Sequence, residues 1–203
     1  MNLLSKFHNA VKMGDIDSVI QCLTDGVEIN GRDYYGNTAI HFALKRGHKN
    51  IIDLLIANGA SVKMKNSDRN TPLHRAALNG DNEIVLTLLD SGALVHEKNS
   101  RGNTALHWAA SNGHLAVVIT LLEKGAKVEE TNNLDETPLH WASNSGKHEV
   151  VDALLQKTSK RSKLVDMKDV NGYTPFLQAC AYGHNKVIST LIARGANVHT
   201  KVL

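Results

Sequence analysis

The feature that most constrains the fold is a four-residue motif that recurs along the chain at a nearly fixed interval. In this sequence of 203 residues, the first three intervals between motifs are 33 residues and the last is 37. A period of this length is typical of a tandem array of small stacked units. The five copies are Thr38-Ala39-Ile40-His41, Thr71-Pro72-Leu73-His74, Thr104-Ala105-Leu106-His107, Thr137-Pro138-Leu139-His140 and Thr174-Pro175-Phe176-Leu177.

Proline and glycine follow the same period and mark the ends of helices. All 3 prolines are the second residue of the motif, and 14 of the 15 glycines fall on recurring positions. In the copy that begins at Thr71, the threonine suits a helix N-cap, and Pro72 suits the first helical position, where its missing N–H costs nothing. Gly80 suits the left-handed residue that ends a helix. The pattern therefore predicts one short helix after each threonine.

A second helix is predicted over residues 81–92, because Ile84, Val85, Leu88 and Leu89 recur on one helical face. Two helices of about three turns cannot bury their apolar faces alone. Stacking equivalent pairs removes this problem, and each buried aliphatic side chain then contributes on the order of 1.5 to 3 kcal/mol.

These motifs resemble the ankyrin repeat. The matching segments are Thr-Pro-Leu-His-x-Ala-Ala-x-x-Gly-His, a Val-Val-x-x-Leu-Leu run and Gly-Ala-x-Val, and together they cover essentially the whole chain. The resemblance implies an all-α fold, an ankyrin-repeat solenoid of stacked helix-turn-helix units with β-hairpin fingers and about six repeats. We expect a single domain over 1–203, with units at approximately 3–33, 34–66, 67–99, 100–132, 133–169 and 170–203.

The chain has 11 histidines, which raises the question of a metal or catalytic site. His41, His74, His107 and His140 occur once per unit, and equivalent residues on packed helices lie about 8 to 10 Å apart, too far to share one zinc ion. The resemblance implies instead that each imidazole bonds its own threonine hydroxyl and a neighbouring loop. Leu177 replaces the histidine in the last unit, so these bonds should be absent there. We expect neither a metal nor a cofactor.

No catalytic motif is present. The sequence contains no Gly-x-Gly-x-x-Gly, no Gly-x-Ser-x-Gly and no phosphate-binding loop. The paired carboxylates Glu129 and Glu130 are interpreted as solvated surface. Cys22 and Cys180 lie in the first and last units and are expected to be separate core thiols, because Cys180 takes the place of a recurring alanine. The chain is therefore not expected to be an enzyme.

Composition and charge point to a soluble protein. A formal net charge of +3 is too small to indicate a nucleic-acid partner by itself. No apolar stretch approaches the roughly 20 residues of a membrane span, and the first residues lack the apolar core of a signal peptide. We expect a cytoplasmic monomer, located in the host cytosol if the protein is a secreted bacterial effector.

Positions that vary between units while the scaffold stays constant are the candidate contact residues, because packing does not dictate them. Trp108 and Trp141 are the main candidate anchors, since tryptophan, tyrosine and arginine dominate interface energetics. Packing against neighbouring repeats is the alternative interpretation of these two rings. Tyr34 and Tyr35 at one fingertip are harder to explain by packing. The predicted partner-binding residues are Tyr34, Tyr35, Asn37, Arg69, Arg75, Leu78, Arg101, Asn103, Trp108, Ser111, Asn112, Leu134, Trp141, Asn144 and Tyr173.

The resemblance implies a non-catalytic module or scaffold that binds a partner protein through its concave groove and fingers. One alternative is the targeting region of a longer multidomain protein, such as a bacterial effector or an enzyme whose chemistry lies outside this chain. A second alternative uses the basic insertion at 157–163, which either lengthens a helix or forms a polar loop. Together with Lys45, Arg46, Arg75 and Arg101 it would bind nucleic acid or anionic lipid, although we expect no nucleic-acid partner.

Overall fold

The structure, a computed structural model, describes residues 2–157 and 163–200. The predicted basic insertion at 157–163 therefore lies largely outside the described residues. The described residues form two compact units, which divide within the third repeat. Unit 1 comprises Met1–Ala76 with Glu83–Leu94, and unit 2 comprises Ala77–Asn82 with Val95–Leu203.

The described chain is built from pairs of short helices. In each pair the second helix has 9 residues. The first helices of the six pairs are α1 (Leu3–Met13), α3 (Ala39–Arg46), α5 (Pro72–Asn79), α7 (Ala105–Asn112), α9 (Pro138–Asn144) and α11 (Pro175–Ala181). The second helices are α2 (Ile16–Thr24), α4 (Lys49–Ala57), α6 (Asn82–Asp90), α8 (Leu115–Glu123), α10 (His148–Gln156) and α12 (Asn185–Ala193). A short 3-10 helix, η1 (Leu164–Asp166), precedes α11.

The predicted start and stop signals are confirmed. Thr104 is the N-cap of α7, with an extended backbone, and Gly113 ends that helix at φ 77° in the left-handed region. In α9, Thr137 is the N-cap and Pro138 is the first helical residue. The motif threonine therefore marks where α3, α5, α7, α9 and α11 begin, whereas α1 begins at Leu3 with Asn2 as its N-cap.

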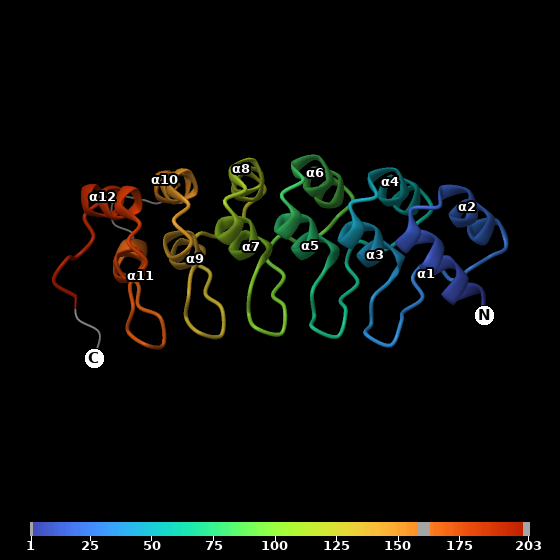
Figure 1. The fold of residues 1–203 in the computed structure, drawn as a ribbon, viewed down its shortest axis with the longest axis horizontal. Helices are drawn as coiled ribbons and strands as arrows, with labels where there is room; N and C mark the ends of the chain where they lie inside the picture. The colour runs from blue at the N-terminus through green and yellow to red at the C-terminus, as the bar shows by residue number, and fades with distance from the viewer. Residues whose placement is uncertain (1, 158–162, 201–203) are drawn as a thin grey trace. The chain divides into compact units, whose positions relative to one another are not determined.

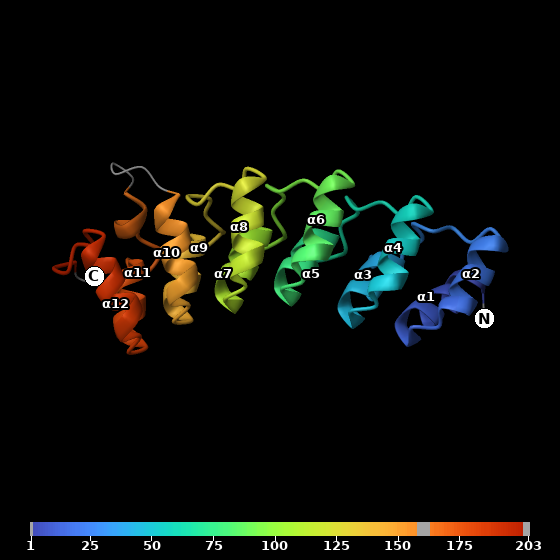
Figure 2. The ribbon, with the colours of Figure 1, turned by 90° about the horizontal axis from the view of Figure 1, so that it is seen from above.

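Within each unit, equivalent helices pack side by side. In unit 1, α1 packs on α3 and α2 on α4, and in unit 2, α9 lies between α7 and α11 (Figure 1). The second helices α8, α10 and α12 form a parallel row in unit 2, as the view from above shows (Figure 2). Each unit thus stacks helix pairs, as the repeat period predicts.

The core is formed by residues in matching positions of successive repeats. One register contains a fully buried side chain in every second helix, namely Cys22, Leu55, Leu88, Leu121, Leu154 and Leu191, each 0% exposed. The small residues of the first helices, such as Ala77, Ala110 and Ser143, are also 0% exposed. Small side chains at these positions let neighbouring helices approach closely.

Cys180 corrects the prediction of two core thiols. Cys22 is buried, but Cys180 is exposed. Both cysteines were predicted to be buried from their positions in the repeat, and Cys180 is at the position of the buried alanines. It lies on α11, which packs on α9 and α12, and no later first helix among the described residues covers its other side. The repeat position of Cys180 therefore predicted more burial than its thiol has in the structure.

The insertion does not lengthen the fifth second helix. The helix α10 has 9 residues, the same number as α8 and α12, and Lys157 is its C-cap. On the far side of the undescribed stretch, η1 buries Leu164, which is 1% exposed. In residues 2–157 and 163–200, no helix has both the length and the apolar character needed to cross a bilayer.

Candidate partner-binding surfaces

A loop projects beyond the first helices of each repeat and forms the predicted finger (Figure 1). In the finger at residues 99–103, Asn99 N–H donates to the Asn103 carbonyl at 3.0 Å, and Asn99 Oδ1 accepts from the Arg101 and Asn103 amides at 3.0 Å each. The same pattern recurs at residues 33–37 and 169–173. These loops are hydrogen-bonded turns, and no described residue in them is in a β-strand.

Neighbouring fingers within a unit are joined through their backbones. In unit 1, Ser67 N–H donates to the Tyr35 carbonyl at 2.9 Å. In unit 2, Asn133 N–H donates to the Arg101 carbonyl and Val170 N–H to the Leu134 carbonyl, each at 3.0 Å. The fingertips of one unit are therefore held in register with one another.

In α3, α7 and α9, the histidine of the motif links the first helix to the next finger, which confirms its predicted structural role. His107 Nδ1 accepts from the Thr104 amide at 3.2 Å, and its Nε2 lies 3.0 Å from the Glu136 carbonyl. A carbonyl can only accept, so Nε2 carries the proton and the ring is neutral. His41 and His140 make the corresponding bonds to the Asn70 and Tyr173 carbonyls.

Burial keeps these imidazoles neutral. Burial lowers the pKa of His107 from its ordinary 6.5 to about 4, against an opposing contribution from the bond to the Glu136 carbonyl. Burial also lowers the pKa values of His41 and His140. Both ring nitrogens of His107 are occupied inside the fold, which leaves this side chain to hold the finger. Leu177 makes no such bond, and Thr174 Oγ1 instead accepts from the Leu177 amide at 3.3 Å.

A second set of histidines joins the helix ends of successive repeats. His114 Nε2 donates to the Leu78 carbonyl at 3.0 Å, and His184 Nε2 donates to the Asn144 carbonyl at 2.8 Å, both within unit 2. In unit 1, His48 Nε2 lies 3.4 Å from the Lys12 carbonyl. Leu78 and Asn144, two of the predicted contact residues, thus have their carbonyls engaged within the fold.

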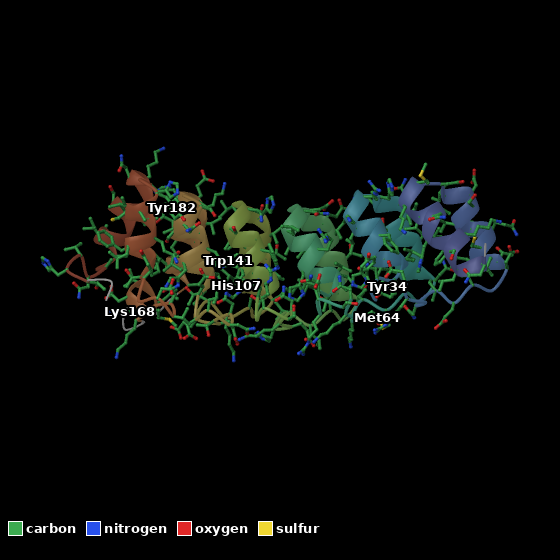
Figure 3. The ribbon with its side chains drawn as sticks, turned by 60° about the horizontal axis from the view of Figure 1, so that its bottom comes forward. Tyr34, Met64, His107, Trp141, Lys168 and Tyr182 are labelled. Carbon is green, nitrogen blue, oxygen red and sulfur yellow. The ribbon has the colours of Figure 1, made fainter. Side chains whose placement is uncertain are left out.

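On unit 1, the predicted contact residues gather around one fingertip. Tyr34 is 94% exposed and Tyr35 is 66% exposed, and their rings meet edge to face with centroids 5.3 Å apart. Tyr35, Asn37 and Arg75 line a common cleft of about 290 Å³ between the finger and the first helices. Arg69 is exposed on the adjacent finger, with φ 59°. Figure 3 labels Tyr34 on this surface.

On unit 2, the predicted anchors Trp108 and Trp141 are brought together. Both are half-buried, and their rings meet edge to face with centroids 5.3 Å apart. Trp141 also packs edge to face on His107, with centroids 5.5 Å apart, and the two are labelled in Figure 3. Its Nε1 donates to Glu136 Oε2 at 2.8 Å. The rings therefore pack within the fold and still expose part of their surface.

The other predicted residues of unit 2 divide into accessible and inaccessible ones. Asn103 is only 2% exposed and its Oδ1 accepts from Asn132 Nδ2 at 3.0 Å, so we remove it from the proposed contact surface. Leu134 is 53% exposed at its fingertip. Arg101 and Asn112 are exposed, whereas Ser111, Asn144 and Tyr173 are half-buried beside the tryptophans or on the fingers.

Two features of these surfaces were missed by the sequence reasoning. Glu136 positions the Trp141 indole, and Lys12 Nζ lies 4.0 Å from the centroid of the Phe42 ring. A signal for the first was available, because Glu136 is the only acidic residue that directly precedes a motif threonine. The second requires knowing which side chains of adjacent repeats meet.

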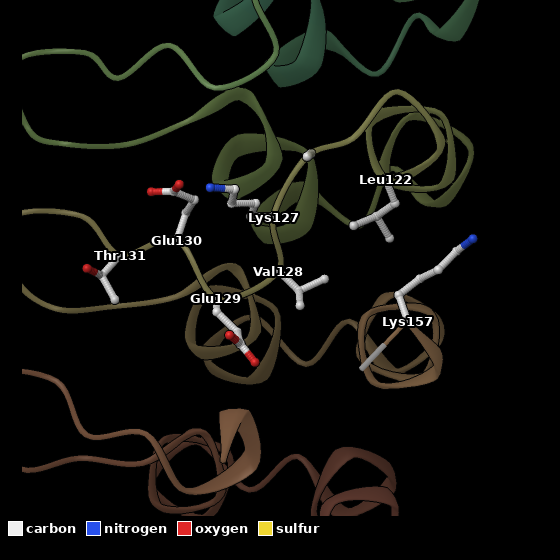
Figure 4. A pocket seen from close by; sticks show the side chains of 8 residues that line it. Leu122, Lys127, Val128, Glu129, Glu130, Thr131 and Lys157 are labelled. Carbon is white, nitrogen blue, oxygen red and sulfur yellow. The ribbon is translucent and has the colours of Figure 1, made fainter. Parts of the chain in front are cut away.

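A separate cleft of about 530 Å³ lies in unit 2, between the end of α8, the following loop and Lys157 (Figure 4). The loop carboxylates belong to the pair assigned to solvated surface. Glu129 is exposed, but Glu130 is half-buried and lies 2.9 Å from Lys98 Nζ. The hydrogen bond from Lys98 lowers the pKa of Glu130. In this way Lys98, which also donates to the Thr131 carbonyl at 2.7 Å, fixes one wall of the cleft.

The helix pairs, capping histidines and hydrogen-bonded fingers define a helical-repeat protein. Comparison with protein families assigns the class. Residues 7–99 and 127–202 match the family described as ankyrin repeats (3 copies), and residues 101–133 match the ankyrin repeat. The chain belongs to the ankyrin repeat family, and its fold is the ankyrin-repeat solenoid. The search of curated proteins finds no match.

Proposed function

We propose that this chain is a non-catalytic module that binds a partner protein through its fingers and first helices. Ankyrin repeats are generally protein–protein interaction modules and typically non-catalytic. The proposal extends this general role to particular surfaces of this chain. We further propose that it acts as a monomeric scaffold in the cytoplasm, with no nucleic-acid partner.

The observation that carries the proposal is the pair of half-buried tryptophans on unit 2. Trp108 and Trp141 present rigid aromatic surface beside the fingers, and such side chains supply most of the binding energy at protein interfaces. The neighbouring His107 and Asn103 have their polar groups engaged inside the fold. Scaffold and contact roles are therefore carried by different side chains, which lets the surface vary while the fold is kept.

Quantitative capture of a partner from cell extract tests the proposal. The variant Trp108→Ala/Trp141→Ala should lose most of the captured protein. The control Ile119→Ala/Ile192→Ala removes apolar surface that is 39% and 49% exposed on second helices. It should capture as much partner as the unmodified chain. Thermal melting of all three proteins separates loss of binding from loss of folding.

Capture that both variants reduce equally would contradict the proposed surface. Capture of no protein above the level of the bare resin would contradict the proposed function itself. If the tryptophan variant loses binding and stability to the same degree, the two rings serve packing alone.

A further inference from the structure

The charges of unit 1 are sorted between its first and second helices. The first helices α1, α3 and α5 contain no aspartate or glutamate. They carry the cations Lys6, Lys12, Lys45, Arg46 and Arg75. The acidic helical residues of unit 1 are all on second helices, at Asp17, Asp53, Glu83 and Asp90, and Lys49 is the one cation on these helices. A negatively charged partner would therefore be attracted to the first helices of this unit more than to the second helices.

Two of these cations share the cleft at the Tyr35 fingertip. Lys45 and Arg75 both line the cleft of about 290 Å³ described above. Within the part of the chain that the structure describes, neither side chain makes an ion pair or a hydrogen bond. Arg75 is half-buried, so part of its side chain is covered by the protein.

In the preceding repeat, the lysine equivalent to Lys45 lies beside an aromatic ring. Lys12 occupies the position equivalent to Lys45, and Phe42 the position equivalent to Arg75. Lys12 Nζ lies 4.0 Å from the centroid of the Phe42 ring, a favourable cation–π contact. In the next repeat the ring is replaced by a guanidinium, so Lys45 shares its cleft with a like charge. Like charges repel, and an anion between them would turn this repulsion into attraction.

The acidic residues nearby do not supply that anion. Asp33 is committed to its finger, because Oδ1 accepts from the Tyr35 and Asn37 amides at 2.9 and 2.8 Å. Asp68 lines the rim of the cleft and is exposed at the fingertip. No ion pair joins it to Lys45 or Arg75 within the described residues.

We propose that the cleft between Lys45 and Arg75 binds a carboxylate side chain from an acidic segment of the partner protein. A guanidinium binds a carboxylate through two parallel hydrogen bonds, and the Lys45 ammonium adds a second positive charge. Tyr35 offers an aromatic surface against the methylene groups of the bound side chain. This inference rests on the proposed protein-binding function and names the chemistry that unit 1 would select.

Charge favours a protein segment over a nucleic acid. Affinity for a polyanion depends on the number of phosphates that lysine and arginine neutralise, and a protein that makes about 6 to 10 such contacts binds with strong salt dependence. Here only Lys45 and Arg75 line the cleft, and Asp68 lines it too. Asp68 repels any anion, but a short segment with one or two carboxylates brings fewer negative charges against it than a continuous chain of phosphates does.

Selection of short random peptides on the immobilised chain tests the inference. Bound peptides should be enriched in aspartate and glutamate relative to the starting library. The charge-reversed variant Lys45→Glu/Arg75→Glu should lose this enrichment and favour lysine and arginine. The matched control Lys6→Glu/Lys63→Glu changes the net charge equally, at exposed sites that do not line the cleft. It should still select acidic peptides.

A selected peptide then measures the effect directly. The neutral variant Lys45→Gln/Arg75→Gln should bind it about tenfold more weakly or worse, because two charge-assisted hydrogen bonds are lost. Replacing the acidic residues of the peptide with their amides should weaken binding to the unmodified protein by the same factor. The measurement with the altered peptide uses only the unmodified protein, so it tests the inference even if a protein variant fails to fold.

Several outcomes would overturn the inference. These are the absence of acidic enrichment, the same change of selection in the control variant, and tighter binding of a thymidine oligonucleotide or of phosphatidylserine vesicles through Lys45 and Arg75. Failure of this inference can also be distinguished from failure of the proposed function. If Lys45→Gln/Arg75→Gln captures the partner normally while Trp108→Ala/Trp141→Ala does not, the acidic-segment inference fails and the proposed function stands.

Discussion

Acidification should destabilise the fold through the buried imidazole of His107. Burial lowers the pKa of His107 from 6.5 to about 4. The unfolded chain therefore binds a proton at a higher pH than the folded chain does. The stabilisation from the neutral ring is fully present above pH 6.5 and is lost as the pH falls from there toward 4. Between pH 7 and pH 5 the loss from this one group is about 2 kcal/mol.

The side chain is 0% exposed, so solvent screening does not reduce this magnitude. The ionisable groups around His107 have opposing effects, since Lys98 and His140 lower its pKa and Glu130 raises it. Burial remains the largest cause. His8, His41 and His140 also have lowered pKa values, so the whole protein should lose more stability than one histidine accounts for.

The variant His107→Leu isolates the contribution of this residue, because leucine already occupies the equivalent position at Leu177. Urea unfolding at pH 7 and pH 5, followed by far-ultraviolet circular dichroism, gives the free energy of unfolding of both proteins. The variant should be less stable at pH 7, since it lacks the bonds to Thr104 and Glu136. Its further loss on going to pH 5 should be smaller than that of the unmodified protein by about 2 kcal/mol. Equal losses in the two proteins would refute the reasoning.

Two further predictions concern close packing and thiol access. Gly102→Ala should destabilise the protein more than Gly172→Ala. Both residues have left-handed backbones, at φ 77° and φ 81°, but only at Gly102 would a new Cβ meet the next finger, 2.7 Å from Asn133 N. The melting temperatures of the two variants measure the difference. Equal decreases would show that the fingers accommodate the new Cβ without cost, which contradicts the prediction. In the folded protein a maleimide should modify Cys180 rapidly and Cys22 only on unfolding, as mass spectrometry can measure. Equal labelling of both thiols without denaturant would contradict the burial of Cys22.

The repeating parts of the fold were predictable because each was specified several times. The caps at Thr104 and Thr137, the buried leucine register and the structural role of His107 follow from local rules that every repeat obeys. Each copy of the motif provides independent support for the others. Agreement across the array therefore identified helices that one isolated repeat would leave ambiguous.

The predictions that failed concern positions where a repeat departs from its neighbours. Register indicated a buried Cys180, but exposure depends on which helices pack against α11. Variation between repeats indicated an accessible Asn103, but its amide oxygen accepts a bond from Asn132. The pairing of Lys12 with Phe42 depends on how adjacent repeats meet in space. The repeat period shows which residues occupy equivalent positions in successive repeats. The contacts above depend instead on how side chains of adjacent repeats meet in space.

The link from a motif histidine to the next finger bears on how such an array can change length. His107 holds the Glu136 carbonyl, and His140 holds the Tyr173 carbonyl in the same way. Excision of the 33 residues 105–137 would join Thr104 to Pro138, and Thr104 would then cap the helix that carries His140. His140 would keep its bond to the Tyr173 carbonyl, whereas the Trp141 indole would lose Glu136 Oε2. Duplication or loss of a whole period is therefore chemically milder than removal of a few residues, which would leave a buried imidazole facing the wrong carbonyl.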